Sequence, residues 1–440
     1  MAHRLTVFGT GYLGATHAAC MAELGYEVLG VDVDEAKVAA LAGGDVPFYE
    51  PGLEPLLRKN LDAGRLRFTT SYADAAAFGD VHFVCVGTPQ LPDSYAADVG
   101  YLDAVVTGLA PYLDRPCVVV GKSTVPVGTA ERLAHRLATE SPAGAGAELA
   151  WNPEFLREGF AIEDTLRPDR LVFGVVGGGH GERVLREVYA PVIDAGTPVV
   201  VTDFATAELV KVSANAFLAT KISFINAMAE VCEAAGGDVK KLSEALAYDE
   251  RIGGRFLHAG LGFGGGCLPK DIRAFMARAG ELGVDQALSF LREVDAINQR
   301  RRTRMVEIAR EVVGGSFAGT RIAVLGASFK PNSDDIRDSP ALDVSAAIRR
   351  EDAEVTVYDP VALGNAKVRY PELSYATSAL DAAAGADAVL HLTEWQEFRD
   401  LDPDTLSPVV RERRIVDGRN ALDPVRWRAA GWTYRALGRP

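Results

Sequence analysis

Short runs of apolar, β-branched residues alternate with longer amphipathic stretches through the first two hundred residues. Five of these runs predict buried strands: Leu5–Phe8, Glu27–Val31, His82–Val86, Cys117–Val120 and Glu148–Trp151. Near-continuous apolar strands are typical of parallel sheets that are covered on both faces. Helical patterns fill the intervals, which indicates βαβ units in a doubly wound sheet. Two further runs, Leu171–Val176 and Val199–Val201, are expected to extend that sheet.

The pattern changes to a helical one after residue 203. One helical stretch runs from about Ala205 to Ala235 without glycine or proline, and a second runs from Ser289 to Val313. A long helix with apolar residues around it needs a covering partner, so we expect a homodimer or a higher homo-oligomer. The second stretch carries four arginines that form either a polyanion site or a solvated or interface face: Arg300, Arg301, Arg302 and Arg304.

Strand patterns return near Arg321, where Arg321–Gly326 is a strand that enters a glycine turn. Three more strands are expected at Glu354–Tyr358, Ala388–Leu392 and Arg414–Asp417. The predicted fold class is therefore α/β, with two Rossmann-like doubly wound parallel-sheet domains bridged by a long central helix. The expected domains are a dinucleotide-binding domain at 1–203, a central helical dimerisation domain with a cysteine loop at 204–316, and a C-terminal α/β domain at 317–440.

Composition narrows the class of protein. The chain has 440 residues, 48% of them hydrophobic and 24% charged, which is typical of soluble proteins with two or three domains. A net charge of −14 argues against nucleic acid as a partner. No apolar run approaches the roughly 20 residues that span a bilayer, and no signal-peptide pattern opens the chain. We expect a cytoplasmic protein without a membrane partner.

The five cysteines favour a reducing compartment, because their number is odd and no pair has the spacing of a metal or redox motif. We therefore expect no metal site. The cysteines are Cys20, Cys85, Cys117, Cys232 and Cys267.

A complete GxGxxG motif follows the first strand, at Gly9-Thr10-Gly11-Tyr12-Leu13-Gly14. Its glycines allow a tight turn, close approach of a pyrophosphate and close packing of helix on strand. Asp32 ends the second strand, where an acid accepts hydrogen bonds from ribose hydroxyls and repels a 2′-phosphate. NAD is therefore expected over NADP, although Lys37 could tolerate additional phosphate charge. The alternative is a Rossmann-like turn that binds no nucleotide.

Residues Gly262-Phe263-Gly264-Gly265-Gly266-Cys267-Leu268-Pro269-Lys270-Asp271 form the most distinctive segment. Buried structural cysteines usually lie in apolar runs, whereas Cys267 follows a glycine-rich loop and precedes a cation and a helix. We interpret Cys267 as a nucleophile. A dehydrogenase that only interconverts alcohol and carbonyl has no need of one. A dehydrogenase that oxidises an aldehyde to an acid uses it to form a thiohemiacetal and then a thioester, which water hydrolyses.

Two further groups of polar residues remain open to two interpretations. Glu154 and Glu158 either complement a helix dipole or, in the case of Glu154, handle a proton or orient a water. Lys211 and Asn215 are four residues apart and share a helix face. Lys211 is flanked by apolar residues, so it either extends to solvent or lies beside developing negative charge.

Taken in their order along the chain, these motifs resemble those of the UDP-glucose/GDP-mannose dehydrogenase family. The resemblance extends over nearly the whole chain. The matching segments are 9–14, 86–89, 123–129, 152–159, 208–226, 262–271 and 325–337. The resemblance implies oxidation of UDP-glucose to UDP-glucuronate with two NAD in succession, by way of an aldehyde, a thiohemiacetal and a thioester. The same reaction on GDP-mannose or UDP-N-acetylmannosamine is the alternative, and a non-catalytic nucleotide-sugar sensor is a second one.

The resemblance also implies roles for individual residues. Cys267 is the nucleophile, Lys211 and Asn215 stabilise oxyanions, and Glu154, Thr124 and Asp271 position or activate water. The implied NAD contacts are Gly9, Gly11, Tyr12, Leu13, Gly14, Asp32, Lys37, Thr88, Thr124, Glu158 and Arg337. The implied substrate contacts are Glu154, Phe155, Leu156, Arg157, Glu158, Lys211, Asn215, Arg251 or Arg255, Phe256, Leu257, His258, Ala259, Gly260, Gly264 and Lys330. One departure is Gly266, where the family commonly has serine.

Overall fold

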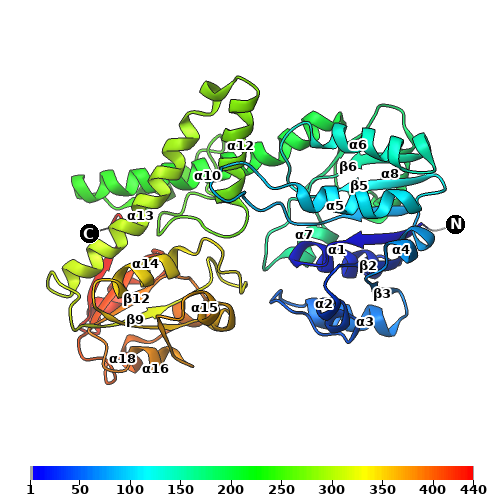
Figure 1. Cartoon of the computed structure of the whole chain (residues 1–440). Helices are drawn as coiled ribbons and strands as arrows, with labels where there is room; N and C mark the ends of the chain where they lie inside the picture. The colour runs from blue at the N-terminus through cyan, green and yellow to red at the C-terminus, as the bar shows by residue number, and fades with distance from the viewer. Residues whose placement is uncertain (1–2, 440) are drawn as a thin grey trace. The chain divides into compact units, whose positions relative to one another are not determined.

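The computed structural model describes residues 3–439, which form two compact units. Among the described residues, unit 1 comprises 3–214 and 273–282, and unit 2 comprises 215–272 and 283–439. The division falls inside the long helix α10 (Phe204–Ala235) and inside α12 (Leu268–Glu281), so each of these helices contributes to both units. Figure 1 shows the two units and the helices that they share.

Unit 1 is built on an eight-stranded sheet with the strand order β3-β2-β1-β4-β5-β6-β7-β8. The strands are β1 (Arg4–Phe8), β2 (Glu27–Val31), β3 (Leu66–Thr69), β4 (Val81–Val84), β5 (Cys117–Gly121), β6 (Ala147–Trp151), β7 (Leu171–Gly174) and β8 (Val199–Thr202). Neighbouring strands are parallel except at β6 and β7. The order reverses between β1 and β4, and ligands of open α/β sheets bind at such a switch point.

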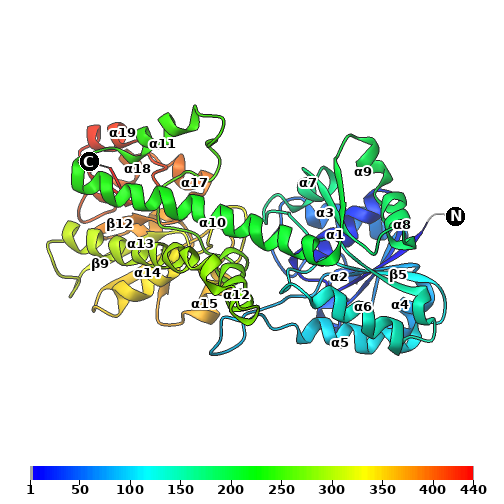
Figure 2. The ribbon, with the colours of Figure 1, turned by 90° about the horizontal axis from the view of Figure 1, so that it is seen from above.

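Helices cover both faces of this sheet, as Figure 2 shows for α5 and α6 on one side and α8 and α9 on the other. Along a strand, successive side chains enter two different cores: Leu5 and Val7 pack with α1 and α8, whereas Phe8 packs with α5. The helices are α1 (Tyr12–Glu23), α2 (Glu35–Ala42), α3 (Leu53–Asp62), α4 (Tyr72–Phe78), α5 (Gly100–Leu109), α6 (Thr129–Glu140), α7 (Ala161–Leu166), α8 (His180–Val188) and α9 (Ala190–Asp194), with short 3₁₀ turns at Ala110–Tyr112 and Gly144–Gly146.

Unit 2 repeats the winding with six parallel strands in the order β11-β10-β9-β12-β13-β14. The strands are β9 (Arg321–Leu325), β10 (Glu354–Tyr358), β11 (Ser374–Tyr375), β12 (Ala388–His391), β13 (Arg414–Asp417) and β14 (Thr433–Ala436). The helices other than α10 and α12 are α11 (Val239–Ala247), α13 (Phe290–Val312), α14 (Pro340–Arg349), α15 (Leu363–Arg369), α16 (Ala379–Ala383), α17 (Gln396–Arg399), α18 (Pro403–Leu406) and α19 (Pro424–Ala429), with a 3₁₀ turn at Asp285–Leu288.

The predicted fold class is confirmed by these two doubly wound sheets and the long helix α10. The strands β3, β11 and β14 were not predicted from the sequence. They are short, and β3 and β11 are largely unburied, so the continuous apolar run that marks a buried strand is missing. Within residues 3–439, no helix combines the length and apolarity that a membrane span needs.

The four arginines of α13 lie in different surroundings: Arg300 is exposed and Arg304 is half-buried, whereas Arg301 and Arg302 are buried. Arg301 is fully buried and pairs with Glu233, while Arg302 pairs with Asp338 and Asp343. Each of these acids lies in unit 2. Arg301 and Arg302 therefore join α13 to α10 and α14 inside unit 2, because a buried guanidinium is tolerated when nearby acids balance its charge.

Candidate active site

The glycine turn after β1 has the shape that a dinucleotide requires. Gly9 has a left-handed φ of +84° and donates its N–H to Val31 O at 2.8 Å, so a side chain there would be strained. A Cβ on Gly14 would collide with the Gly9 carbonyl, whereas a Cβ on Gly11 would meet no atom within 4 Å. Gly9 and Gly14 therefore close the turn, and the open space at Gly11 leaves room for a pyrophosphate to approach the backbone.

Helix α1 begins at Tyr12, directly after this turn. Among residues 3–439, no side chain caps its N-terminus and its first turn carries no acid. The positive dipole end of this helix therefore faces the turn, where it favours a phosphate. These features fit the dinucleotide predicted from the motif.

Asp32 lies at the end of β2 and is almost fully buried. Its Oδ2 accepts hydrogen bonds from Thr10 N at 2.8 Å, Thr10 Oγ1 at 3.0 Å and Lys37 Nζ at 2.9 Å. Burial alone would raise the pKa of Asp32, but hydrogen bonds from Lys37, Thr10 and Asp34 outweigh it and hold the pKa below its usual value. The carboxylate at this position is therefore ionised at neutral pH, and Lys37 is paired with it.

Two loops at neighbouring strand ends carry Thr88 and Thr124. Thr88 Oγ1 donates to Thr124 O at 2.7 Å, and Ser123 Oγ donates to Val86 O at 2.7 Å. The two predicted threonines are thus brought together after β4 and β5, at the carboxyl edge of the sheet. Thr124 is half-buried.

Helix α10 is fastened to the loop that follows Thr124 by one buried acid, Glu208. Its carboxylate accepts from Gly128 N and Ala130 N, each at 2.7 Å, at the start of α6. Burial raises the pKa of Glu208 to about 7, although the backbone donors and the charge of Arg278 act in the opposite direction. Glu208 therefore fixes the Thr124 loop to the helix that carries Lys211.

The segment after β6 places Glu154 against a buried cation. Glu154 Oε2 lies 3.0 Å from Lys122 Nζ, and its Oε1 accepts from Phe155 N at 2.8 Å and Leu156 N at 3.1 Å. Glu154 is thus part of a polar network rather than a free charge at a helix start. Arg157, by contrast, is exposed and pairs with Asp164 at 2.6 Å, and Glu158 is half-buried.

Lys211 is half-buried, with its Nζ 5.4 Å from the centre of the Phe155 ring. A cation over an aromatic face gains roughly 0.5–2 kcal/mol. The side chain therefore lies beside the 154–158 segment, and the structure brings Lys211, Phe155 and Glu154 together in unit 1.

In unit 2, Cys267 is exposed and immediately precedes α12. Asp271 N donates to Cys267 O at 3.0 Å, which is the first bond of that helix. The sulfur thus lies at the positive end of the helix dipole, where negative charge is stabilised. The other four cysteines are buried.

Asn215 and Asp271 meet on the buried side of the cysteine segment. Asn215 Nδ2 donates to Asp271 Oδ2 at 2.6 Å, and Lys270 Nζ donates to Asp271 Oδ1 at 2.5 Å. Asp271 lies in the first turn of α12, four residues after Cys267. The structure therefore groups Cys267, Asp271, Lys270 and Asn215 in unit 2.

The glycines before Cys267 let the loop lie directly on the segment 329–340. A Cβ on Gly265 would lie 2.7 Å from the Phe329 ring, and one on Gly264 would collide with the Asp338 carbonyl. Gly265 N donates to Arg337 O at 2.8 Å. The segments 262–271 and 325–337, which both carry the family resemblance, are therefore in contact.

Gly266 matters because of Arg337. A Cβ on Gly266 would lie 2.5 Å from both terminal nitrogens of the Arg337 guanidinium. Arg337 is itself held by Asp335, with Nη2 and Oδ2 2.7 Å apart. The absence of a side chain at residue 266 thus lets this cation lie over the residue before Cys267.

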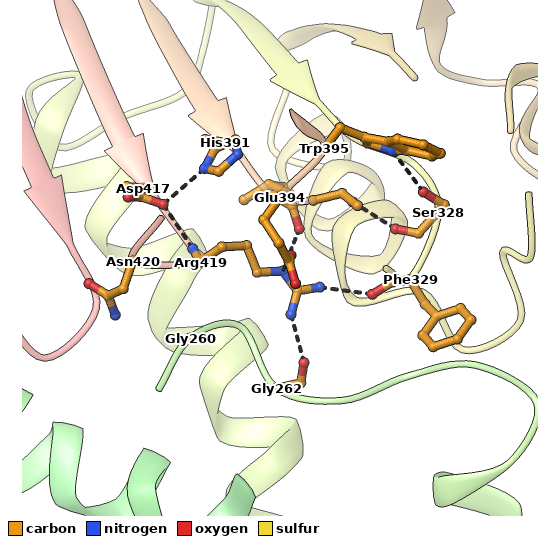
Figure 3. Close-up of polar contacts among 12 residues, drawn as sticks. Gly260, Gly262, Ser328, Phe329, His391, Glu394, Trp395, Asp417, Arg419 and Asn420 are labelled. Atoms are coloured by element: carbon orange, nitrogen blue, oxygen red, sulfur yellow. Dashed lines mark hydrogen bonds and ion pairs between the residues drawn. The ribbon is translucent and has the colours of Figure 1, made fainter. Parts of the chain in front are cut away.

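The segment 256–264 is held by residues that the sequence analysis did not single out. Arg419 donates from Nη1 to Gly262 O at 2.9 Å and from Nη2 to Phe329 O at 3.1 Å, and Asn420 Nδ2 donates to Ala259 O at 3.1 Å, around the loop in Figure 3. The signal available in the sequence was the polar run Asp417-Gly418-Arg419-Asn420 directly after β13.

Asp417 fixes the start of this run. Its Oδ1 accepts from Arg419 N at 3.0 Å and lies 2.9 Å from His391 Nδ1. Both Asp417 and His391 are fully buried. Arg419 is therefore oriented by a buried pair at the ends of β12 and β13.

Other predicted substrate residues lie in different surroundings. Phe256 has a left-handed φ of +64°, which is strained for an aromatic residue and is typical of functional loops. Leu257, Ala259, Gly260 and Gly264 are buried, whereas His258 and Arg255 are exposed. Arg251 is exposed and pairs with Asp249 at 2.6 Å, and the Lys330 ammonium lies 5.2 Å from the centre of the Phe329 ring.

Comparison with known proteins identifies the family. Residues 3–193 match the NAD binding domain of the UDP-glucose/GDP-mannose dehydrogenase family, residues 205–300 match its central domain, and residues 323–424 match its UDP binding domain. The chain belongs to this family. The glycine turn and Asp32 lie in the NAD binding domain, so NAD is the cofactor, as predicted. The third domain indicates a UDP-linked ligand for unit 2.

Individual relatives agree over the full chain. A UDP-glucose 6-dehydrogenase from Rhizobium meliloti (strain 1021) is 42% identical over 438 residues, which cover 99% of this chain and 100% of that protein. The structure of a UDP-glucose dehydrogenase from Pyrobaculum islandicum matches with a TM-score of 0.91 and 37% identity, over 100% of this chain and 98% of that one. A UDP-D-ManNAc dehydrogenase from Pyrococcus horikoshii matches with a TM-score of 0.86 and 28% identity, over 99% of each chain.

Proposed function

We propose that this protein oxidises UDP-glucose to UDP-glucuronate with NAD⁺ as the oxidant. The single observation that carries the proposal is Cys267, exposed at the start of α12 beside the Asn215–Asp271 pair, in a chain that also has an NAD binding domain. An exposed nucleophile is needed only if the product is an acid. Bound NAD⁺ supplies a hydride acceptor for each of the two oxidations.

The proposed reaction consists of two oxidations followed by a hydrolysis. In the first oxidation the C6 hydroxyl loses a proton and a hydride and becomes an aldehyde. The Cys267 thiolate then adds to that aldehyde, and the resulting thiohemiacetal loses a second hydride to become a thioester. Water attacks the thioester carbonyl and returns Cys267 as the thiol, with the acid as product. Each tetrahedral species carries a negative oxygen, and Lys211 and Asn215 are proposed to stabilise it.

Glu154, Thr124 and Asp271 are proposed to position the water and its proton. The carboxylate of Glu154 is already fixed by three donors, so it can present a lone pair in a defined direction. Asp271 receives hydrogen bonds from Asn215 and Lys270 and is nearly fully buried. Because these hydrogen bonds hold the carboxylates of Glu154 and Asp271 in place, each can accept a hydrogen bond from water in a defined direction.

The cofactor and substrate contacts are proposals of the same kind. NAD is expected to contact the turn Gly9–Gly14, Asp32, Lys37, Thr88, Thr124, Glu158 and Arg337. The UDP-sugar is expected to contact residues 154–158, Lys211, Asn215, Arg251, 256–260, Gly264 and Lys330. UDP-glucose is favoured over UDP-N-acetylmannosamine because identity is 37–42% with the UDP-glucose enzymes and 28% with the ManNAc enzyme.

The decisive experiment measures NADH released per sugar nucleotide for UDP-glucose, UDP-N-acetylmannosamine and GDP-mannose. Two NADH per UDP-glucose, with UDP-glucuronate as product, is the expected result. The Cys267→Ser variant is expected to lose net acid production and to stall at an aldehyde-level or ester-linked species. Acid formation at the wild-type rate by this variant would refute the role of Cys267 as the nucleophile. If none of the three sugar nucleotides gave NADH, the proposed dehydrogenase activity would be refuted.

We further propose a homodimer that pairs through α10. Phe217, Phe224 and Val231 are spaced by seven residues and are 67%, 48% and 57% exposed, which is the period of a helix–helix seam. A second copy of the chain fits this stripe, because identical helices present self-complementary surfaces about a two-fold axis. A cytoplasmic location fits the thiol chemistry of Cys267, which needs a reducing compartment.

A further inference from the structure

Lys122, the residue after β5, is the most deeply buried lysine near the proposed site and has no role in the mechanism above. Its side chain is only 3% exposed. Its ammonium donates to Asn152 Oδ1 at 2.9 Å and to Tyr189 Oη at 3.3 Å, and lies 3.0 Å from Glu154 Oε2. These three partners account for its three N–H donors.

The network around Lys122 is tied to three strands and a helix junction. Tyr189, between α8 and α9, donates its hydroxyl to Asn152 Oδ1 at 2.8 Å. Asn152 Nδ2 in turn donates to Val172 O of β7 at 3.0 Å. The ammonium is therefore held by rigid elements of unit 1, and its direction toward Glu154 is fixed.

Burying a lysine is costly unless its charge is balanced. Burial alone would lower the pKa of Lys122, but the charge of Glu154 and contacts with Tyr189 and Cys85 raise it above its usual value. A buried ion pair adds little net stability compared with apolar residues of similar size. Stability alone therefore gives a weak reason for this pair.

We propose that Lys122 is a positioning residue that acts on the reaction through Glu154. The inference rests on the proposed function, in which Glu154 orients water. Lys122 holds Oε2 while the backbone amides of Phe155 and Leu156 hold Oε1, so the carboxylate has one orientation. Without the ammonium, Glu154 retains the two amide contacts but loses the partner that fixes its second oxygen.

A double-mutant cycle tests this coupling. The variants are Glu154→Gln, Lys122→Met and the double variant, with kcat and KM measured from NADH release. Each single variant is expected to lower kcat about 10²-fold, since a group displaced by about 1 Å can cost that much. The double variant is expected to fall within about three-fold of the slower single variant, because both changes disable the same group. KM for UDP-glucose is expected to change much less than kcat, because the larger loss lies in the chemical step.

Lys59→Met is the matched control. Lys59 also pairs with an acid in unit 1, Glu23 at 2.6 Å, but is exposed. Its loss is expected to leave kcat unchanged, since exposed ion pairs contribute little.

The outcomes separate the inference from the proposed function. A wild-type kcat for Glu154→Gln would refute the role of Glu154 and leave the cysteine chemistry standing. Losses that multiply in the double variant would refute the coupling to Lys122. If Lys122→Met does not fold, recovery of folding and of thermal midpoint in the double variant supports the coupling. Failure of both to fold shows that Lys122 is purely structural and overturns the inference.

Discussion

At the scale of single residues, the space at Gly266 decides where a cation lies. The guanidinium of Arg337 occupies the volume that a side chain at residue 266 would need. Because a guanidinium at the end of a flexible side chain can move, a small side chain at 266 is expected to displace it rather than to break the loop. The glycine that stands at residue 266 in place of the family's usual serine therefore leaves space for the Arg337 guanidinium.

We predict that Gly266→Ser folds and turns over, with KM for NAD⁺ raised a few-fold and KM for UDP-glucose little changed. The reason is that Arg337, a proposed NAD contact, must move by the width of one carbon. Initial-rate kinetics with each substrate varied in turn measure both constants. Gly266→Ala adds the same Cβ without a hydroxyl and should behave alike. A normal KM for NAD⁺ in both variants would show that Arg337 does not contact the cofactor.

Lys211 gives a second residue-scale prediction. Lys211→Ala is expected to lower kcat by about 10²–10³, the usual cost of losing one preorganised charge donor. Lys221→Ala is the matched control, because Lys221 lies on the same helix and donates to the Ile252 and Gly253 carbonyls. Steady-state rates of NADH release compare them. A kcat for Lys211→Ala within a few-fold of wild type would contradict the oxyanion role and favour simple packing against Phe155.

At the scale of elements, the sequence was most informative where a long stretch had one periodicity. Helix α10 begins and ends within one residue of its predicted bounds, because no glycine or proline interrupts it. What could not be predicted were contacts between residues far apart in the chain. Glu208 bonds to residues 78 and 80 positions earlier, and Arg419 bonds to Gly262 157 positions earlier. A single sequence carries no signal for such pairs.

Glu208 joins α10 to α6 and gives a pH-dependent prediction. Burial raises its pKa from the ordinary 4.5 to about 7, so the folded state keeps a proton that the unfolded state releases between these two pH values. Stability should therefore fall as pH rises from about 4.5 to 7, by on the order of 3 kcal/mol in total.

Thermal midpoints of wild type and Glu208→Gln at pH 5 and pH 8 test this effect. The glutamine variant cannot ionise, so its midpoint relative to wild type should be higher at pH 8 than at pH 5. Glu131→Gln, an exposed position on α6, is the control and should run parallel to wild type. If the midpoint of Glu208→Gln also changed with pH as the wild-type midpoint does, the Glu208 carboxyl would ionise normally in the folded protein.

At the scale of the whole molecule, the two sheets repeat one strand order with different ligands. Both wind outward from a first central strand, β1 in unit 1 and β9 in unit 2. Both carry an acid at the end of the second strand that receives hydrogen bonds from the turn after the first: Asp32 accepts from Thr10, and Asp359 accepts from Ala327 and Ser328. In unit 2 the Nε1 of Trp395 also donates to Ser328 Oγ in the turn and to Asp359 Oδ2, each at 3.1 Å. The shared winding could be predicted from the strand runs, whereas the different surroundings of the two acids could not.

The oligomer proposed for the whole protein depends on α10. Replacing Phe224 with glutamate puts a charge in the middle of the exposed stripe, and burying that charge between two copies would cost several kcal/mol. Phe224→Glu is therefore expected to convert a dimer into a monomer, as measured by sedimentation or light scattering at several protein concentrations. Val368→Glu is the control, because Val368 is 86% exposed on α15, away from the stripe, and should leave the mass unchanged. A dimer that persists in Phe224→Glu, or a wild type that is monomeric at all concentrations, would remove α10 as the interface.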